Sequence, residues 1–354
     1  MKNTLPNSIH IEYSSCGHVQ GIAVDTAHKH VYVSFTTVLV KADMEGNIIG
    51  SVTGLTGHLG CIDFNDEDGK VYGSLEYKRD SIGKGIAARL GTKLADEDAF
   101  YIAIFDVDKI DRIGMDGERD GIMKAAYLSE VVGDFSFEAP DGIKHRYGCS
   151  GIDGTTIGKV FGQENTPSML FTCYGIYGDN TRDDNDCQVI LQYDWRKLSE
   201  AARPLSQENF HHSGADAEKK YFLYTGNTTW GIQNLEYDSY SNNFFAAVYR
   251  GKKDHFPNYP MFVIDGSNAP VEKEIPGLNG EKGLMLKLKE TKVYDEKSGI
   301  YGSEFPYGST GIYSVGDGMF YFSHDSKVSD NVYATDIKLY RLTNKEELFE
   351  IKNS

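Results

Sequence analysis

Short apolar stretches alternate with polar turns along the whole chain, and one phrase of this pattern recurs. Residues 17–25 read GHVQGIAVD, followed by a turn and the apolar stretch 31–35. Residues 57–65 read GHLGCIDFN, followed by a turn and a similar stretch at 71–76. Weaker copies lie at 148–153, 231–238 and 308–313. The recurrence predicts five structural repeats.

Each repeat predicts four strands. The copy of the motif supplies the first strand, and a stretch rich in Val, Tyr, Phe and Ser supplies the second. A third apolar stretch ends at an aspartate in four repeats, at Asp43, Asp106, Asp194 and Asp265. A fourth strand follows, as at 47–52 in the first repeat. Short alternating strands separated by turns are typical of all-β proteins, and four strands per repeat indicate a β-propeller.

We therefore predict one all-β domain over residues 1–354, a five-bladed β-propeller with four-stranded antiparallel blades. The blades begin near residues 17, 57, 147, 230 and 308. The main alternative is a sixth, degenerate blade hidden in an insertion. The ring is expected to close through its ends, because 331–342 and 347–351 supply strands to the last blade and 9–13 alternates as an added outer strand.

The repeats are unevenly spaced, which predicts insertions. Equivalent positions at 21, 61, 151, 234 and 311 lie about 40, 90, 83 and 77 residues apart, whereas a bare blade needs roughly 40. The insertions fall at 77–99, with a helical segment around 85–94, and at 195–221, with a helical segment at 196–202. Long loops of this kind commonly cover or form binding sites.

Composition and charge limit the classes of molecule that this protein is expected to bind. The formal net charge of −16 makes nucleic acid and anionic membranes poor partners. The first residues lack the apolar stretch of a signal peptide, and no apolar stretch is long enough to span a membrane. The five cysteines are odd in number and show no CxxC spacing, so we expect buried thiols in a cytoplasmic protein. Residues 83–87 do not form a Walker motif, and no nucleotide cofactor is expected. The oligomeric state stays open.

Propeller topology predicts where polar residues gather. The motif is the innermost strand, and the second strand returns to the face where the motif starts, so both meet at one mouth of the ring. Motif starts carry His18, Gln20, His58, Trp230 and Gln233, and His145 precedes the third motif. Second strands end at Thr36, Glu76, Lys78, Tyr249, Arg250, His324 and Asp325.

A second set of polar residues lies two positions past the glycine position of the motif. The middle three repeats carry carboxylates there, namely Asp63, Asp153 and Glu236. We expect these groups to approach the axis, where like charges raise at least one pKa and so separate an acid from a base. The alternative is that these carboxylates, like His18 and His58, only satisfy buried backbone groups.

The repeat resembles that of β-propeller proteins in general, over nearly the whole chain. Five-bladed propeller glycoside hydrolases place three carboxylates around the axis, which is similar to Asp63, Asp153 and Glu236. Propeller lyases that act on uronides use rim histidines and a divalent metal, which is similar to His18, His58 and His324. These resemblances are at the level of the fold. The expected five blades argue against a close relationship to those lyases, which resemble this chain in fold type but form seven-bladed rings.

Three hypotheses follow for function. The first is an intracellular enzyme, of lyase, isomerase or hydrolase type, that acts on a carbohydrate or similar polyhydroxylated molecule. A divalent metal held by His18, His58 and His324 would polarise a substrate oxygen or a bound water, with Glu76 or Asp325 as base. Gln20, Lys78, His145, Trp230, Gln233, Tyr249 and Arg250 would bind the substrate.

The second hypothesis is a metal-free glycoside hydrolase that uses Asp63, Asp153 and Glu236 as its catalytic carboxylates. The third is a propeller that binds a ligand or a partner without catalysis. We favour an enzyme because the polar groups gather on one mouth and the long insertions lie where they can cover it.

Overall fold

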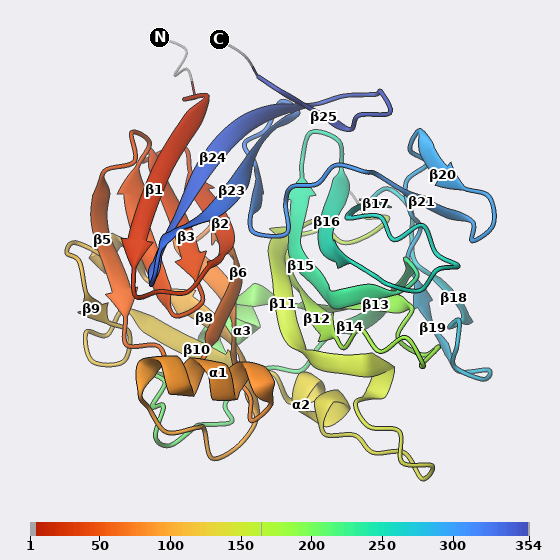
Figure 1. The fold of residues 1–354 in the computed structure, drawn as a ribbon, viewed down its shortest axis with the longest axis horizontal. Coiled ribbons are helices and arrows are strands. Elements are labelled where there is room, and N and C mark those ends of the chain that lie inside the picture. The colour runs from red at the N-terminus through yellow and green to blue at the C-terminus, as the bar shows by residue number, and fades with distance from the viewer. Residues whose placement is uncertain (1–4, 164, 353–354) are drawn as a thin grey trace.

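The computed structural model describes residues 5–163 and 165–352 and forms a five-bladed β-propeller (Figure 1). Blade 1 contains β2 (Val19–Asp25), β3 (His30–Phe35), β4 (Val38–Asp43) and β5 (Ile48–Thr53). Blade 2 contains β6 (His58–Asn65), β7 (Lys70–Tyr77), β8 (Ala99–Phe105) and β10 (Met123–Tyr127). Blade 3 contains β11 (Cys149–Gly158), β12 (Met169–Ile176), β13 (Cys187–Tyr193) and β14 (Lys219–Tyr224).

Blade 4 departs from the predicted four strands. Its sheet has three, β15 (Thr228–Asp238), β16 (Asn243–Arg250) and β17 (Met261–Asp265). Two isolated bridges, Ile264 with Leu288 and Met261 with Ser303, stand where the fourth strand would pair. The chain after β17 instead forms β18 (Val271–Glu274) and β19 (Lys282–Met285), and β19 runs parallel to β14 of blade 3. The side chains of β18 are all exposed, so this strand has no apolar face to pack as the fourth strand of blade 4.

Blade 5 closes the ring as predicted. It contains β22 (Ile312–Ser314), β23 (Met319–Ser329) and β24 (Val332–Leu342), with β25 (Phe349–Ile351) on the far end of β24. The N-terminal strand β1 (Ser8–Ser14) pairs antiparallel with β24. Within β1, Ile9 and Ile11 are buried and their neighbours are exposed, so one apolar face fixes its register. The last blade is thereby joined directly to the first.

The repeated glycines have a packing reason at the axis. A Cβ at Gly21 would lie 3.0 Å from Cys61 Cα, and a Cβ at Gly154 would lie 2.9 Å from the Ile232 side chain. Glycine therefore lets neighbouring inner strands approach closely. Side chains then link these strands: Ser34 Oγ donates to Gly60 O at 2.7 Å, and Asn234 Nδ2 donates to Gln20 O at 2.8 Å. The centre of the ring is cross-linked rather than an open channel.

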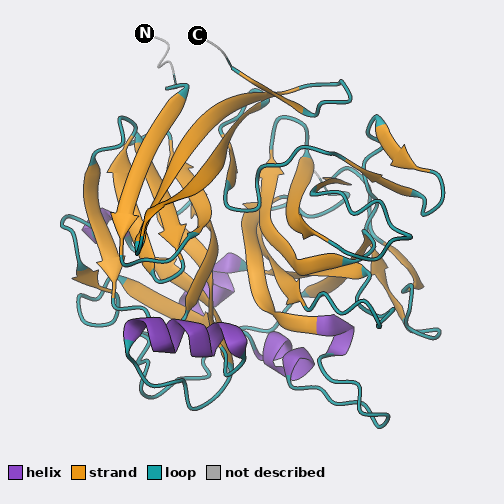
Figure 2. Cartoon of the chain, in the orientation of Figure 1, coloured by secondary structure: helices purple, strands orange, loops and turns teal. Residues whose placement is uncertain are grey.

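The remaining elements sit in the connections, and both predicted helical insertions are present. The insertion after β7 carries α1 (Ser81–Leu90), and the insertion after β13 carries α3 (Trp195–Ala201). The other elements are α2 (Ser129–Phe135), the 3₁₀ turns η1 (Val107–Lys109) and η2 (Arg146–Gly148), and the short strands β9 (Met115–Asp116), β20 (Val293–Asp295) and β21 (Ile300–Gly302). Helices α1 and α2 lie below the blades in the same view (Figures 1 and 2).

Two further expectations concern the cysteines and the membrane. All five cysteines are free and buried, and burial raises the pKa of the Cys16 thiol to about 12. Within the described part of the chain, no helix combines the length and the apolar character that crossing a membrane requires. The cytoplasmic location stays a prediction.

Candidate functional site

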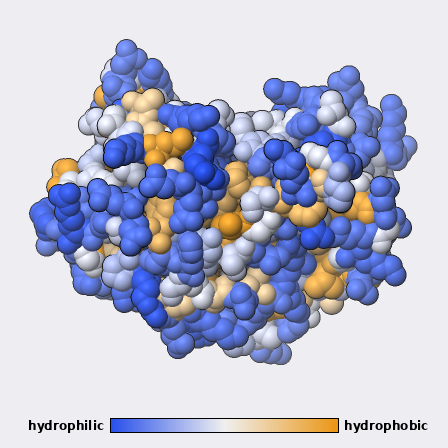
Figure 3. All heavy atoms as spheres, turned by 90° about the horizontal axis from the view of Figure 1, so that it is seen from below, coloured by the Kyte–Doolittle hydropathy of each residue, from blue (hydrophilic) through white to orange (hydrophobic). Residues whose placement is uncertain are grey.

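A cavity of about 320 Å³ opens where the inner strands start, and we call it the axial cavity. Nine of the residues given a predicted role at the site line it: His18, Gln20, His58, Glu76, Lys78, Asp153, Trp230, Gln233 and Tyr249. Its wall also includes Thr36, Ser150 and, from α1, Ile82, Ile86 and Arg89. The face that carries the helices is mainly hydrophilic, with hydrophobic atoms visible towards its middle (Figure 3).

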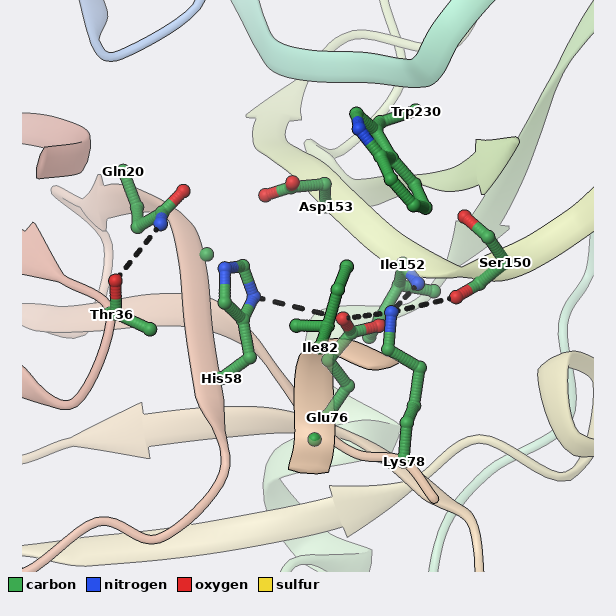
Figure 4. Close-up of polar contacts among 12 residues, drawn as sticks. Gln20, Thr36, His58, Glu76, Lys78, Ile82, Ser150, Ile152, Asp153 and Trp230 are labelled. Atoms are coloured by element: carbon green, nitrogen blue, oxygen red, sulfur yellow. Dashed lines mark hydrogen bonds and ion pairs between the residues drawn. The ribbon is translucent and has the colours of Figure 1, made fainter. Parts of the chain in front are cut away.

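A buried ion pair forms one wall of the axial cavity (Figure 4). Lys78 Nζ lies 2.6 Å from Glu76 Oε1 and donates to Ser150 O at 2.8 Å, and both side chains are 4% exposed. Glu76 Oε2 accepts from Ile152 N at 3.1 Å. Burial raises the pKa of Glu76, and the Lys78 ammonium opposes that rise. Burial acts to lower the pKa of Lys78, but the Glu76 and Asp80 carboxylates outweigh it and raise that pKa. The pair is therefore ionised.

Strand β11 makes room for this pair. Gly151 has φ +126°, and a Cβ there would lie 2.0 Å from Glu76 Oε2. Only glycine tolerates both the backbone conformation and the close approach of the carboxylate. The glycine of the third motif thus has a role at the site as well as in the blade.

Asp153 reaches into the cavity from blade 3, as Figure 4 shows. The residue is 7% exposed, and its Oδ1 accepts from Cys61 N of blade 2 at 3.2 Å. Gly60 clears its path, because a Cβ at that position would lie 2.3 Å from Asp153 Oδ1. Burial first, and then the negative charge of Glu76, raise the pKa of Asp153 well above its ordinary value. Burial therefore favours the protonated form of Asp153, whereas the Lys78 ammonium in contact with Glu76 favours the ionised form of Glu76.

The two predicted histidines differ in their surroundings. His58 is largely buried, and its Nδ1 lies 3.7 Å from Glu76 Oε1 without a hydrogen bond. Burial, together with Lys78, His18 and Arg89, lowers the pKa of His58 to about 3, so this ring is neutral. His18 is exposed at the mouth, with Nδ1 3.0 Å from Val19 O and Nε2 3.2 Å from Gln20 Nε2.

Two amides and two aromatic rings complete the wall. Gln20 Nε2 donates to Thr36 Oγ1 at 3.2 Å, and Gln233 Nε2 donates to Trp230 O at 2.9 Å. Among the described residues, neither glutamine Oε1 accepts a hydrogen bond, so both remain acceptors for a ligand. Trp230 lies 5.8 Å, between ring centroids, from Tyr177. Burial, then Asp153 and Asp325, raise the pKa of Tyr249 to about 12.

Helix α1 brings residues to the site that the sequence did not single out. The Asp80 side chain caps it by accepting from Ile82 N at 2.9 Å and Gly83 N at 3.1 Å, and it ends at Gly91 with φ +65°. Its last turn carries Arg89 to the axial cavity. The predicted helical segment in this insertion was the sequence feature that could have pointed to Arg89. Its position could not be predicted, because alternation along the strands gives no information about where a helix between them packs.

A second cavity of about 580 Å³, which we call the side cavity, lies beneath the same helix. It shares His58, Glu76, Lys78, Ile82 and Ile86 with the axial cavity. The insertion after β13 forms part of its wall through Gln207, which accepts from Tyr77 OH at 2.9 Å. Both predicted insertions therefore border the same region.

Six residues predicted for the site lie outside the axial cavity, and four of them were predicted at its mouth. His324 stacks on Tyr307 with a centroid distance of 3.8 Å, and its Nε2 lies 3.0 Å from Tyr340 OH. Arg250 turns outward to Glu304, at 2.7 Å. The alternation of side chains along a strand explains both positions. His324 lies two residues after Phe322 and shares its face, which packs on an apolar cluster, whereas Arg250 is adjacent to Tyr249 and points to the opposite face.

The other two are His145 and Asp325. His145 packs against Tyr177, at a centroid distance of 5.0 Å, with its Nδ1 2.6 Å from Phe135 O. Asp325 is exposed and accepts from Thr310 Oγ1 at 3.2 Å.

The predicted three-histidine metal site is not assembled, because His324 lies apart from His18 and His58. No group of three or more His, Cys, Asp or Glu side chains is placed to hold a metal ion in residues 5–163 and 165–352. The residues present at the mouth therefore do not fit the metal centre that the sequence suggested.

The three predicted axial carboxylates also separate. Asp63 and Glu236 line another cavity, of about 440 Å³, which does not include Asp153. Asp63 Oδ2 accepts from Ile157 N at 2.6 Å, and Glu236 Oε1 accepts from Ser314 N at 2.7 Å. Each carboxyl thus links its blade to the next one. The pairing of β11 with β12 shifts between Ile152 and Thr155, and such an irregularity redirects the side chain inside it.

No protein-family model and no curated protein matches the chain. Among solved structures, an aldose sugar dehydrogenase from Escherichia coli is 9% identical with a TM-score of 0.39, covering 95% of this chain and 100% of its own. A GH43 β-1,3-galactosidase with galactodeoxynojirimycin is 11% identical with a TM-score of 0.43, covering 95% and 94%. A pyranose dehydrogenase PQQ domain from Coprinopsis cinerea is 10% identical with a TM-score of 0.34, covering 90% and 81%. Likenesses this low carry no argument about the chemistry of this chain.

Proposed function

We propose that this protein is an enzyme that binds a sugar-like, polyhydroxylated small molecule in the axial cavity and performs acid–base chemistry on it. The observation that carries the proposal is Asp153, a buried carboxyl group in a polar cavity whose pKa is raised by burial and by Glu76. Two carboxyl groups whose surroundings push their pKa values apart are the usual arrangement of an acid–base site.

The wall of the cavity supports a ligand with many hydroxyl groups. Its volume of about 320 Å³ lies at the small end of the range for small-molecule sites. The free Oε1 atoms of Gln20 and Gln233 are acceptors for hydroxyl donors. Trp230 and Tyr249 offer aromatic surfaces on which the apolar face of a sugar ring can pack.

The roles follow from the hydrogen bonds. Asp153 donates its proton to a ligand oxygen and is left as a carboxylate. His18 takes up a proton from the ligand: with Nδ1 3.0 Å from Val19 O, the ring proton belongs on Nδ1, and the lone pair on Nε2, which accepts from Gln20 Nε2 at 3.2 Å in the free protein, receives it. Glu76 is a positioning residue, because its charge, held by Lys78, adds to burial in keeping the proton on Asp153. Since His324 lies elsewhere, the proposal assigns these histidines no metal.

The test compares the wild type with Asp153→Asn, which keeps an oxygen for Cys61 N but has no acidic proton to transfer. Binding of a panel of free sugars and aryl glycosides is measured by calorimetry, and products are identified by chromatography, which separates hydrolysis, elimination and isomerisation. General acid catalysis typically contributes about 10²- to 10⁴-fold, so we expect a loss of kcat in that range with little change in affinity.

The control is Asp141→Asn, an exposed aspartate in the loop after α2, which should keep full activity. If sugars bind but no variant or wild-type protein turns any of them over, the propeller is a ligand-binding protein and the catalytic part of the proposal is wrong. If no sugar binds, the whole proposal is wrong.

A further inference from the structure

Arg89 is a cation at the axial cavity, and no group within residues 5–163 and 165–352 neutralises it. In the part of the chain that the structure describes, its guanidinium makes no hydrogen bond and no ion pair, although the protein carries 52 acidic residues. The nearby Lys78 is fully engaged by Glu76 and by Ser150 O. The last turn of α1 therefore leaves a free guanidinium on the wall of the cavity.

The fold holds Arg89 in this position. The guanidinium lies against Gly17, where a Cβ would stand 2.3 Å from Arg89 Nη1 and 2.4 Å from Thr36 Oγ1. Gly17 has φ +77°, so the chain adopts a conformation there that other residues rarely take and leaves space for the arginine. A cation in the last turn also stabilises a helix, but this does not explain why Arg89 reaches across from blade 2 to blade 1.

The charge of the remaining wall is compensated. The Glu76 carboxylate offsets Lys78, burial keeps His58 neutral, and Asp153 favours its protonated form. Arg89 is thus the uncompensated charge among these groups of the axial cavity. The segment 81–95 around it carries Lys84, Arg89 and Lys93 and no acidic residue, in a protein whose net charge is −16.

From this geometry we propose that the ligand of the axial cavity carries an anionic group, a carboxylate or a phosphate, which Arg89 binds. This inference rests on the proposed sugar-like ligand and narrows it to a sugar acid or a sugar phosphate. The planar guanidinium binds such groups through two parallel hydrogen bonds. Arg89 takes the role that the sequence suggested for Arg250, which is instead paired with Glu304.

The experiment measures binding of glucose, galactose, their uronic acids and their 6-phosphates by calorimetry. Hydrogen bonds to a charged group predict that an acidic sugar binds about 10- to 100-fold more tightly than its neutral parent. Arg89→Ala should remove this difference. Lys84→Ala is the matched control, because it deletes an exposed cation of the same helix that lines neither cavity, and it should preserve the difference.

Preference for the uronic acids identifies a carboxylate, and preference for the 6-phosphates identifies a phosphate. In both cases added salt should weaken the acidic ligand more than the neutral one. If neutral and acidic sugars bind equally, or the difference survives Arg89→Ala, the inference is overturned while the proposed function stands. If none of these sugars binds, the proposed function fails and the inference with it.

Discussion

The ion pair between Glu76 and Lys78 offers the sharpest physical test of the site. Replacing Lys78 by Met keeps most of the volume of the side chain but removes the ammonium, which lies 2.6 Å from Glu76 Oε1. The variant leaves a carboxylate that is 4% exposed and retains one hydrogen bond, from Ile152 N. Asp80, which lies 3.7 Å from the same ammonium, also loses a favourable neighbour.

The size of the effect follows from these distances. Two unit charges 2.6 Å apart attract by about 6 kcal/mol at an effective dielectric constant of about 20. Removing one partner of a buried pair typically costs about 3–5 kcal/mol, because the remaining charge is uncompensated. With an unfolding entropy of about 2.1 cal/mol/K per residue, the 354 residues give about 0.74 kcal/mol/K. We therefore expect the Tm of Lys78→Met to fall by about 4–7 °C.

The pH dependence identifies the cause. Without Lys78, a proton is the only partner available to Glu76, so the folded-state pKa of Glu76 lies further above its unfolded value. The native state then binds that proton more tightly, and the stability of the variant falls as the pH rises above about 4.5. The loss relative to the wild type should accordingly be larger at about pH 8 than at about pH 5.

The assay is calorimetric or optical thermal unfolding of the wild type, Lys78→Met, Glu76→Gln and the double variant. Because the two side chains interact directly, the loss in the double variant should be clearly smaller than the sum of the single losses. Additive losses, or a loss for Lys78→Met that is the same at both pH values, would refute the view that an ionised pair stabilises the wall of the axial cavity.

Three further predictions address other parts of the molecule. Burial raises the pKa of Asp63 from 3.8 to about 7, so the wild type should lose about 4 kcal/mol of stability as the pH rises from about 4 through 7. Asp63→Asn should flatten that dependence in urea unfolding, and an unchanged slope would contradict it. Gly17→Ala introduces a Cβ at φ +77° that meets Arg89 and Thr36, so it should cost about 1–3 kcal/mol and speed hydrogen exchange in α1, whereas equal exchange would show that α1 does not depend on this contact. The five buried free thiols should react with an aromatic disulfide reagent only as fast as the protein unfolds, and rapid native labelling would contradict their burial.

The repeat pattern was enough to predict the architecture. Alternating apolar positions and regularly placed glycines predicted five blades, the third strands that end near Asp43 and Asp265, and the insertions that carry α1 and α3. Closure by β1 was also predictable, because the alternation of residues 9–13 is local and marks them as an added outer strand. These features depend on the periodicity of the chain itself, which is visible without knowledge of its neighbours.

The site was predictable only in part. Strand order placed nine of the chosen residues at one cavity, because every inner strand starts at the same mouth. Alternation taken one step further would have excluded His324, which shares a face with Phe322, and Arg250, which alternates with Tyr249. The expectation that Asp63, Asp153 and Glu236 meet at the axis was wrong for a different reason. It assumed that the inner strand pairs with the second strand in the same register in every blade.

Local sequence thus determined where the strands lie, where glycines allow the inner strands to pack closely, and at which end of the ring the polar residues gather. These features depend on period-two alternation and on turn residues, whose effects extend over only a few residues. Tertiary structure decided which charges meet. The irregular register of β11 separated Asp153 from Asp63 and Glu236, and α1 carried Arg89 across to Gly17 of another blade. Such pairings depend on contacts between segments far apart in the sequence, where a shift of one residue reverses the direction of a side chain.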